Sequence, residues 1–350
     1  MNLPPEFWTY LKVVLLVATV PAIVGFVIVL AERRIMGFMQ VRLGPNRVGP
    51  QGTLQGLADL LKLVTKEDIT PARAERAVHF LSPVLAVIPA LTALAVIPFG
   101  PPIRIGKQMV PLWVADLNIG LLFLLAITSI GVYGIILGGW SSNNKYSLLG
   151  GLRSAAQLVS YEVPMGLSLV SVLLMTRSLS LVEIVRRQES THLWFVFPGL
   201  VAFFFLGEYT GMIVISCIAV TVFFGGWLPP FSHVPALAFL GFVPGAVWFL
   251  LKVAFFIFCY IWFRSTFPRY RFDQLMALGW KWLIPISLAN ILAVAFAILL
   301  TPRRTNGLVA LSWIYGGLFV MMFLLSKLRR ALVRRDRLAA SGPAEAGAEV

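Results

Sequence analysis

The chain has 350 residues, of which 59% are hydrophobic and 13% charged, and its formal net charge at pH 7 is +14. Soluble globular domains are about 45–50% apolar and about 25% charged, so this composition excludes a soluble domain. The apolar runs continue for about 20 residues instead of alternating over about 10, which predicts transmembrane helices and not a barrel. We therefore expect an all-α, polytopic bundle of eight to nine spans.

The positive charge has an explanation within the membrane. Basic residues cluster in loops and in the C-terminal tail, so orientation in the bilayer and anionic lipid account for them before nucleic acid does. No cleavable signal is recognisable ahead of the first apolar run, and no transit peptide either. The expected location is therefore a bacterial inner membrane.

In chain order, the first span is predicted at about residues 13–30, with Trp8 and Tyr10 as interfacial anchors ahead of it. A polar stretch follows at 31–71, and its residues 44–52 hold three glycines and two prolines, which cannot continue a helix. The next segment divides its side chains between two helix faces, which predicts an amphipathic helix on the membrane surface. Its apolar face holds Leu54, Leu57, Leu61 and Val64, and its polar face Gln55, Asp59, Lys62 and Lys66.

Further spans are predicted from the later apolar runs. They lie at about 83–99, 119–139, 159–175, 242–263, 283–300 and 308–325, with a surface helix over 177–192. We expect one transmembrane domain over residues 1–326, with cytoplasmic loops at 31–80 and 264–281. The tail at 327–350 is basic at first and then of disordered composition.

Residues 193–227 present a difficulty. If this region crosses the membrane once, the basic residues of the later loops fall outside, whereas two crossings put most basic residues in the cytoplasm. Yet 35 residues are too few for two spans of about 20 residues and a turn. One helix of this length would measure about 52 Å, against a hydrocarbon core of about 30 Å. We therefore predict two antiparallel helices, with residues missing from the chain near 203–206.

Ionisable side chains inside spans are energetically costly and indicate function by default. Four occur here: Glu32, Glu162, Glu208 and Lys252. Burial disfavours the charged form of an acid or a base, so such groups are suited to exchange protons near neutral pH. The alternative is structural, for example an ion pair of Glu208 with Lys252 that holds two helices together.

Metal, nucleotide and disulfide sites are not indicated. The three histidines are scattered, and the two cysteines lie in separate apolar runs without the spacing of metal ligands. The glycine-rich run is not a phosphate loop, because Gly49 is followed by Pro50 and Gln51 where Lys and Ser or Thr are needed. Any redox chemistry must therefore reside in other chains.

Three motifs carry a family resemblance: AERRIMGFMQVRLGPNRVGPQG, SSNNKYSLLGGLRSAAQLVSYEVP and RSTFPRYRFDQLMALGWKWLIP. They resemble the H subunit of proton-translocating NADH-quinone oxidoreductase, respiratory complex I, in order and over nearly the whole chain before the tail. The resemblance implies a membrane component that forms much of the quinone chamber and links quinone reduction to proton translocation. It also implies neighbouring membrane subunits and peripheral-arm partners, which hold FMN and iron–sulfur clusters, with no cofactor on this chain alone.

The resemblance also implies roles for individual residues. The predicted proton path consists of Glu32, Glu162 and Glu208. The predicted quinone-binding residues are Arg33, Arg34, Arg42, Pro45, Asn46 and Arg47, near an entrance formed by the first span and the amphipathic helix. The predicted docking surface for partner subunits consists of Arg264, Arg269, Arg271 and Asp273. No metal ligands are implied.

One departure from the family matters for the site. Its members carry a long acidic cytoplasmic loop between the fifth and sixth spans, with a pattern like Asn-Arg-x-Pro-Phe-Asp-Leu-Pro-Glu-Ala-Glu. In this chain, residues 198–205 lead directly to Gly207, Glu208 and Tyr209. The chain is therefore expected to lack carboxylates that the family places next to quinone.

Two other functions fit a polytopic membrane protein. The membrane anchor of an energy-converting hydrogenase belongs to the same superfamily and uses no quinone, but the complete LGPNRVGPQG and FPRYRFDQLM motifs favour the respiratory enzyme. A stand-alone secondary transporter would predict an internal repeat and broken helices, and the sequence contains no recognisable repeat.

Overall fold

The computed structural model describes residues 4–67, 69–106, 108–191, 194–195, 211–230, 241–266 and 270–300. The chain divides into two compact units, residues 1–288 and 289–350. In the second unit, the described part is the end of one helix, and the predicted span at 308–325 and the tail lie outside the described residues. The first unit contains the predicted site residues that the structure describes.

The chain starts with one long helical stretch. It consists of α1 (Pro5–Ala22), the π-helical segment η1 (Ile23–Ile28) and α2 (Val29–Met39). Pro21 lies just before η1 and removes one backbone donor from the helix ladder, and such interruptions accompany π-helical turns. The helix continues past the predicted end at residue 30 because good helix formers occupy residues 31–36.

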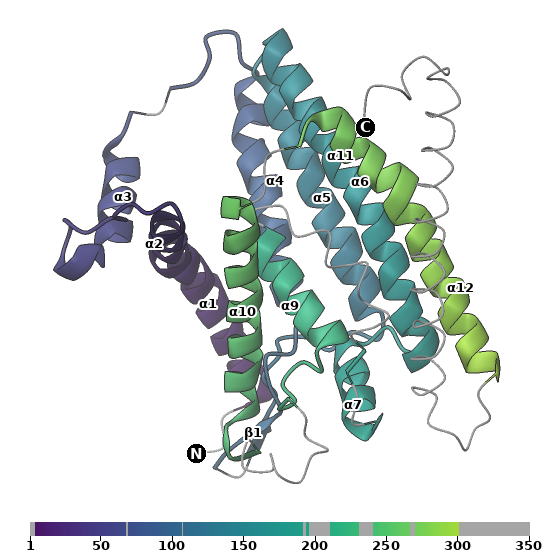
Figure 1. Cartoon of the computed structure of the whole chain (residues 1–350). Helices are drawn as coiled ribbons and strands as arrows, with labels where there is room; N and C mark the ends of the chain where they lie inside the picture. Colours follow the sequence, from purple (N-terminus) through teal and green to yellow (C-terminus); the bar gives the residue numbers. More distant parts are fainter. Residues whose placement is uncertain are drawn as a thin grey trace, which may run out of the picture. The chain divides into compact units, whose positions relative to one another are not determined.

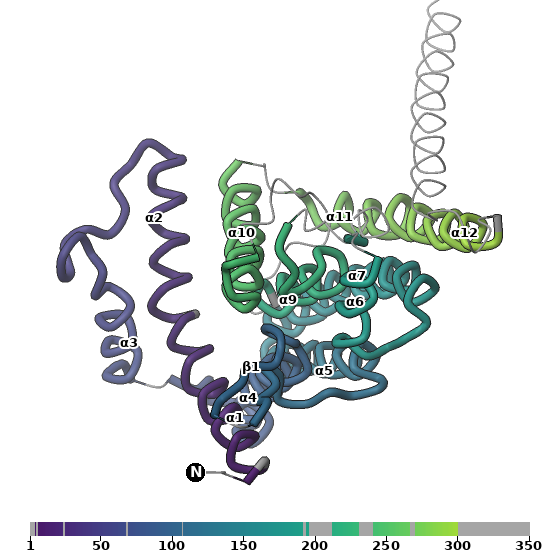
Figure 2. The backbone as a smooth tube through the Cα atoms, turned by 90° about the horizontal axis from the view of Figure 1, so that it is seen from below, coloured from purple at the N-terminus to yellow at the C-terminus, as the bar shows by residue number. Residues whose placement is uncertain are grey.

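The amphipathic helix is present as α3 (Gln55–Thr65), and the short 3₁₀ turn η2 (Pro50–Gly52) precedes it. Figure 2 shows α3 beside α2. The two segments approach closely at Gly56, where an added Cβ would lie 2.9 Å from both the Gly25 carbonyl oxygen and the Phe26 Cα. A glycine is therefore required for α3 to pack against the π-helical part of the first helix.

Three long helices form an up-and-down bundle: α4 (Arg76–Leu94), α5 (Gly120–Ser141) and α6 (Lys145–Thr176). They lie side by side in Figure 1. Small residues bring α4 and α5 together, and the Ser82 hydroxyl donates a 2.6 Å hydrogen bond to the Gly134 carbonyl. Such contacts are typical of helices that pack within a membrane, where the lipid is as apolar as a leucine side chain.

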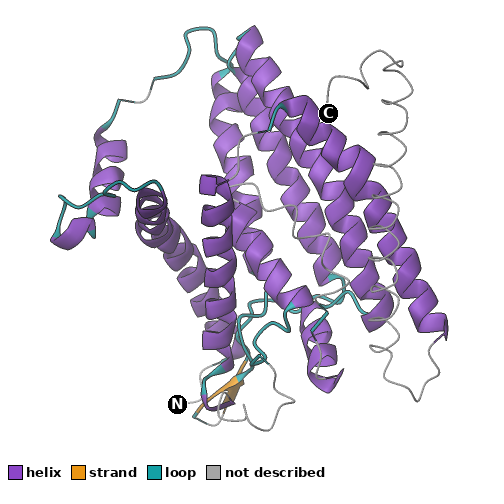
Figure 3. Cartoon of the chain, viewed as in Figure 1, coloured by secondary structure: helices purple, strands orange, loops and turns teal. Residues whose placement is uncertain are grey.

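An unpredicted hairpin lies between α4 and α5, where the sequence indicates a proline-rich loop. Its strands β1 (Ile103–Ile105) and β2 (Gln108–Val110) pair antiparallel, with Ile103 opposite Val110 (Figure 3). The indole of Trp8 donates to the side-chain oxygen of Gln108 at 3.1 Å, and Lys12 donates to the Trp113 carbonyl at 2.9 Å. The start of the first helix is thereby tied to the segment around this hairpin.

The predicted surface helix is α7 (Leu181–Thr191), and α9 (Gly211–Phe223) follows it among the described helices. The buried Gln188 side chain of α7 donates 3.0 Å hydrogen bonds to the carbonyls of Thr221 and Val222 and accepts one from the Phe195 backbone N–H at 3.4 Å. These hydrogen bonds hold the C-terminal half of α7 against the end of α9. The number of membrane crossings between residues 193 and 227 stays a prediction. The predicted break near 203–206 lies outside the described residues.

The last described helices are α10 (Gly245–Thr266), α11 (Phe272–Leu278), the π-helical η5 (Gly279–Leu283) and α12 (Ile284–Leu300). Within the described residues, six helical stretches are long and apolar enough to cross a membrane, and α9 is a shorter apolar helix. The prediction of a helical membrane bundle is confirmed.

Candidate functional site

Two sequence motifs that lie far apart in the chain meet at Glu32. This residue is on α2 and is only 6% exposed. The Arg264 guanidinium at the end of α10 donates to its carboxylate at 2.9 Å, and the hydroxyl of the adjacent Ser265 lies 2.7 Å from the Met39 sulfur. The contact joins a predicted proton-path residue to a predicted docking residue, and it brings the ends of α2 and α10 together.

A second ion pair lies on the neighbouring face of α2. The Arg33 guanidinium contacts the Asp59 carboxylate of α3 at 2.7 Å, and Gln55 donates to the other oxygen of that carboxylate at 3.1 Å. Because both charged groups are partly exposed, the pair contributes little stability, in the range of about 0–1 kcal/mol. Together with the close approach at Gly56, it fixes the position of α3 along the first helix.

The turn over residues 40–54 carries the remaining predicted quinone-binding residues except Arg34, which lies on α2. The side chains of Arg42, Asn46 and Arg47 are exposed, whereas Arg34 and Pro45 are half-buried. Arg42 donates from its Nε to the Gln40 side chain at 2.8 Å. Gly52 has a φ of +76°, and a Cβ there would lie only 2.2 Å from the Pro45 carbonyl oxygen, so the turn needs glycine at this position.

Glu162 lies half-buried on α6, in a different pair of helices. The Ser129 hydroxyl of α5 donates to its carboxylate at 2.9 Å. Glu32 contacts α10, so the structure places these two predicted proton-path carboxylates on separate helix pairs. The third, Glu208, lies outside the described residues, as does a predicted ion pair of Glu208 with Lys252.

The predicted docking residues surround the connection from α10 to α11. Arg271 and Asp273 are exposed at the start of α11, where the Arg271 backbone N–H donates to the Gln274 side chain at 3.2 Å. Arg269 lies outside the described residues. The Arg153 guanidinium of α6 stacks on the Phe272 ring at 5.6 Å, so α11 rests on the first half of α6.

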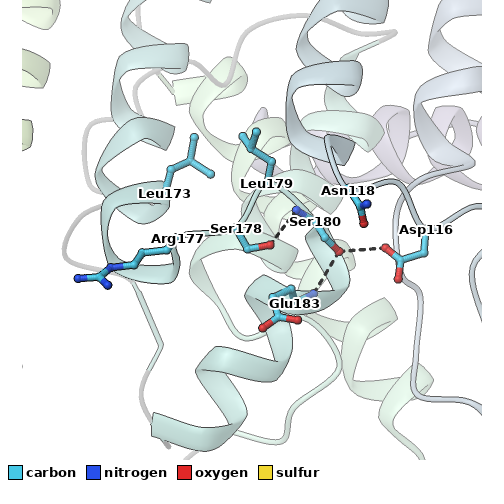
Figure 4. Close-up of a pocket in the computed structure, with 8 residues that line it drawn as sticks. All are labelled: Asp116, Asn118, Leu173, Arg177, Ser178, Leu179, Ser180 and Glu183. Carbon is cyan, nitrogen blue, oxygen red and sulfur yellow. Dashed lines mark hydrogen bonds between the residues drawn. The ribbon is translucent and has the colours of Figure 1, made fainter.

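An open pocket of about 600 Å³ lies elsewhere, where α6 ends and α7 begins (Figure 4). The Ser180 hydroxyl donates to the Asp116 carboxylate at 2.9 Å and accepts from the Glu183 backbone N–H at 3.4 Å, which closes the first turn of α7. The pocket contains none of the predicted site residues. Among the described residues, no cluster of three His, Cys, Asp or Glu side chains is arranged to hold a metal ion.

Sequence reasoning did not identify several partners in this site. The partners of Glu32 and Arg33 are Arg264 and Asp59, at sequence separations of 232 and 26 residues. The acidic Asp59 on the polar face of the amphipathic helix was a usable signal, because an arginine one helix away needs a counter-ion. No local pattern indicates that Ser129 contacts Glu162 or that Lys252 donates to three backbone carbonyls.

Comparison with known proteins identifies relatives across most of the chain. The family model described as NADH dehydrogenase matches residues 11–205 and 198–295. The H subunit of NADH-quinone oxidoreductase from Magnetococcus marinus is 45% identical, over 83% of this chain and 91% of its own. One H subunit of the same enzyme from Geobacter metallireducens is 45% identical over 78% of this chain and 91% of its own. The H subunit from Rhodospirillum centenum is 44% identical over 80% of this chain and 91% of its own.

These alignments also contain positions that this chain lacks. The match to the Magnetococcus protein extends over 330 positions, but 83% of this chain is only about 290 residues. About 40 positions of the relative therefore have no counterpart here. The family match is divided in two at residues 198–205, which agrees with the predicted site of the missing residues.

Proposed function

Because this chain belongs to the NADH dehydrogenase family, together with H subunits of NADH-quinone oxidoreductase, we propose that it forms part of the quinone chamber and links quinone reduction to proton translocation. As a component of that enzyme complex, it has other subunits as partners. The observation that carries the proposal is the grouping of α2, the basic turn, α3 and α10 around Glu32, Arg33 and their ion-pair partners.

The surfaces of this group match the chemistry of a quinone. A quinone has a polar ring with two carbonyl oxygens and a long hydrocarbon tail. The exposed side of α3 offers Leu57, Leu60, Leu61 and Val64 to such a tail. The exposed Arg42 and Arg47 offer guanidinium N–H donors to the carbonyl oxygens or to the negative charge that reduction creates. The turn and α3 would thus frame the entrance to the chamber.

The buried Glu32 can link charge changes at quinone to the rest of the bundle. Reduction of a quinone takes up two electrons, which partner subunits supply, and two protons to give a quinol. Negative charge near the basic turn would compete with Glu32 for Arg264, and a carboxylate that loses its guanidinium in a buried place takes up a proton. The ion pair is therefore suited to convert an electron transfer into a proton transfer.

We assign Glu162 and Glu208 to the continuation of this proton path. Glu162 is the only described carboxylate within the α6 span, and the hydroxyl of Ser129 orients it by a hydrogen bond. A hydroxyl can both donate and accept, so it can pass a proton between a carboxyl group and a water molecule.

The connection from α10 to α11 is proposed to dock the peripheral subunits that carry the redox centres. Arg264 lies in the last turn of α10, Arg269 lies between the two helices in the sequence, and Arg271 and Asp273 are exposed at the start of α11. The location that fits such a membrane-bound complex is the bacterial inner membrane. The quinone-site subunits of the peripheral arm and the small membrane subunits are the proposed neighbours, and FMN and iron–sulfur clusters belong to partner subunits.

The relatives separate this proposal from its alternatives. All three relatives named above are components of NADH-quinone oxidoreductase, which favours this enzyme over an energy-converting hydrogenase. Membership in a family of complex components disfavours a stand-alone transporter. We further infer that the missing 40 or so positions include the acidic cytoplasmic loop, so quinone chemistry here depends more on the basic turn and on Glu32.

Substitution of Arg42 tests the proposed entrance. In the assembled complex, Arg42→Ala is expected to raise the KM for quinone about 5- to 10-fold, because a hydrogen bond to a charged group contributes about 1.5–3 kcal/mol and water competes for it at an exposed position. Electron transfer from NADH to ferricyanide should stay unchanged, because it does not use the quinone site. The matched control is Arg104→Ala in the exposed β1 strand, which should leave the quinone KM as it is. An unchanged quinone KM in an assembled Arg42→Ala complex would refute the entrance.

A further inference from the structure

Lys252 occupies an unusual setting on α10. It is the eighth residue of that helix, about 10 Å from its start at a rise of about 1.5 Å per residue. Its ammonium group donates to the carbonyl oxygens of Phe224 at 2.6 Å, Gly226 at 3.0 Å and Leu228 at 2.7 Å. The Trp194 ring centroid lies 4.5 Å from the same nitrogen.

The three carbonyls belong to the turn that directly follows the end of α9. The α9 helix ends at Phe223, and the chain then turns, with the Gly226 N–H donating to the Val220 carbonyl at 2.8 Å. The last carbonyls of a helix have no partners within the helix and carry the negative end of its dipole. In an apolar interior such groups must find donors, because an unsatisfied carbonyl costs several kcal/mol.

The Lys252 ammonium group has the number of donors and the charge that these carbonyls require. It has three N–H donors, and three carbonyl oxygens accept them. The indole face provides a further attraction for a cation. Rings of carbonyl oxygens at broken helix ends are the sites at which membrane transporters coordinate small cations. Here the chain supplies the cation from its own neighbouring helix.

We propose that the Phe224, Gly226 and Leu228 carbonyls and the Trp194 ring form a cation site that the Lys252 ammonium fills, so that Lys252 is a positioning residue for α9. It holds the end of α9 against α10 through hydrogen bonds to the backbone. It does not carry protons through the membrane, because all three of its N–H groups are engaged with carbonyls, which accept hydrogen bonds but do not take up protons at neutral pH. This inference does not depend on where quinone enters.

The site also connects α10 to α7. Trp194 follows α7 by three residues, and its ring contacts Phe224 at a centroid distance of 5.8 Å. Gln188 of α7 accepts from the Phe195 N–H and donates to the carbonyls of Thr221 and Val222, one turn before the lysine site. Two side chains from two helices thus satisfy backbone carbonyls here: Gln188 those of the last turn of α9, and Lys252 those of the turn that follows it.

Three substitutions at this position separate positioning from proton transfer in the assembled complex. Lys252→Arg keeps the charge and the donors but cannot release a proton at physiological pH. Lys252→Gln keeps two N–H donors without charge. Lys252→Met keeps the length of the side chain and removes both. Leu250→Met on the exposed side of the same helix is the matched control and should behave as the wild type does.

The measurements are the amount of assembled complex, its rate of quinone reduction, and the protons translocated per electron in proteoliposomes. We expect Lys252→Met to lower assembly or turnover at least 10-fold, and Lys252→Gln or Lys252→Arg to recover at least a third of the wild-type value. The protons per electron should equal the wild-type ratio in each variant that turns over. This ratio is the readout that distinguishes the two roles.

Three results would overturn the inference. A Lys252→Met complex with wild-type assembly and turnover would mean that the lysine positions nothing of consequence. A lowered proton-to-electron ratio in Lys252→Gln or Lys252→Arg would identify Lys252 as a proton carrier. Failure of all three variants to assemble, while the Leu250→Met control assembles, would also contradict it, because the donors that Arg and Gln retain should hold the turn.

Discussion

The ion pair of Glu32 with Arg264 makes a directional prediction about stability. The carboxylate is 6% exposed, whereas the Arg264 side chain is 50% exposed. Arg264→Met removes the guanidinium that donates to this buried carboxylate, and loss of one member costs about 3–5 kcal/mol for a fully buried pair. Because water reaches the Arg264 side of this pair, we expect about 1–3 kcal/mol.

Substitution of the other member of the pair, Glu32, should lower stability less. Glu32→Gln leaves an amide oxygen that still accepts from the guanidinium, and the half-exposed Arg264 keeps its water, so we expect about 0.5–1.5 kcal/mol. The two substitutions combined should restore about 1–2 kcal/mol relative to Arg264→Met alone, since the buried negative charge is then gone. The asymmetry follows from burial and not from the identity of the two residues.

The assay is the temperature at which assembled complex in membranes loses half of its quinone reductase activity. A change of 1 kcal/mol shifts the melting temperature of a 150–250-residue domain by about 2–4 °C, and a larger unit by less. The wild type is expected to be the most stable and Arg264→Met the least stable, with Glu32→Gln and the double variant between them. A Glu32→Gln variant less stable than Arg264→Met, or strictly additive effects in the double variant, would refute the reasoning.

Three further predictions concern positions where the structure leaves little space or places a half-buried carboxylate. Gly56→Ala should displace α3, which lowers stability by about 1–3 kcal/mol and raises the quinone KM. Gly25→Ala, where an added Cβ meets open space, should change neither stability nor KM. The same quinone KM in the two variants would contradict this prediction. Gly52→Ala should disturb the basic turn and weaken quinone binding, while Gly106→Ala, equally left-handed but unobstructed, should leave quinone binding intact. Glu162→Gln should lower quinone reduction and proton translocation together in complex that still assembles; normal activity per assembled complex would assign the residue a structural role.

The helical bundle was predictable because a membrane span is a local property of about 20 consecutive residues. The predicted spans at 119–139 and 242–263 match α5 and α10 within a few residues. The amphipathic helix was predictable for the same reason, from its 3.6-residue period. The end of the first helix was not, because continuation through Met39 depends on many small propensities and on packing with α3 and α10.

The candidate site was predictable in its residues but not in its contacts. Charge inside a span singled out Glu32, Glu162 and Lys252 without any structure. Their partners come from helices elsewhere in the chain: Arg264 for Glu32, Ser129 for Glu162, and backbone carbonyls for Lys252. A sequence pattern cannot indicate a backbone carbonyl as a partner, since every residue has one. For that reason Lys252 resembled a proton carrier in the sequence.

Photolabelling most directly tests the central claim, that the first helix, the basic turn and α3 frame the entrance for quinone. A photoreactive quinone would be added to the assembled complex in membranes, and the labelled peptides of this chain mapped with and without excess quinone. We expect label within residues 31–66 that excess quinone suppresses, and less of it in Gly56→Ala than in Gly25→Ala. Label that excess quinone does not suppress, or that falls elsewhere in the chain, would contradict the account.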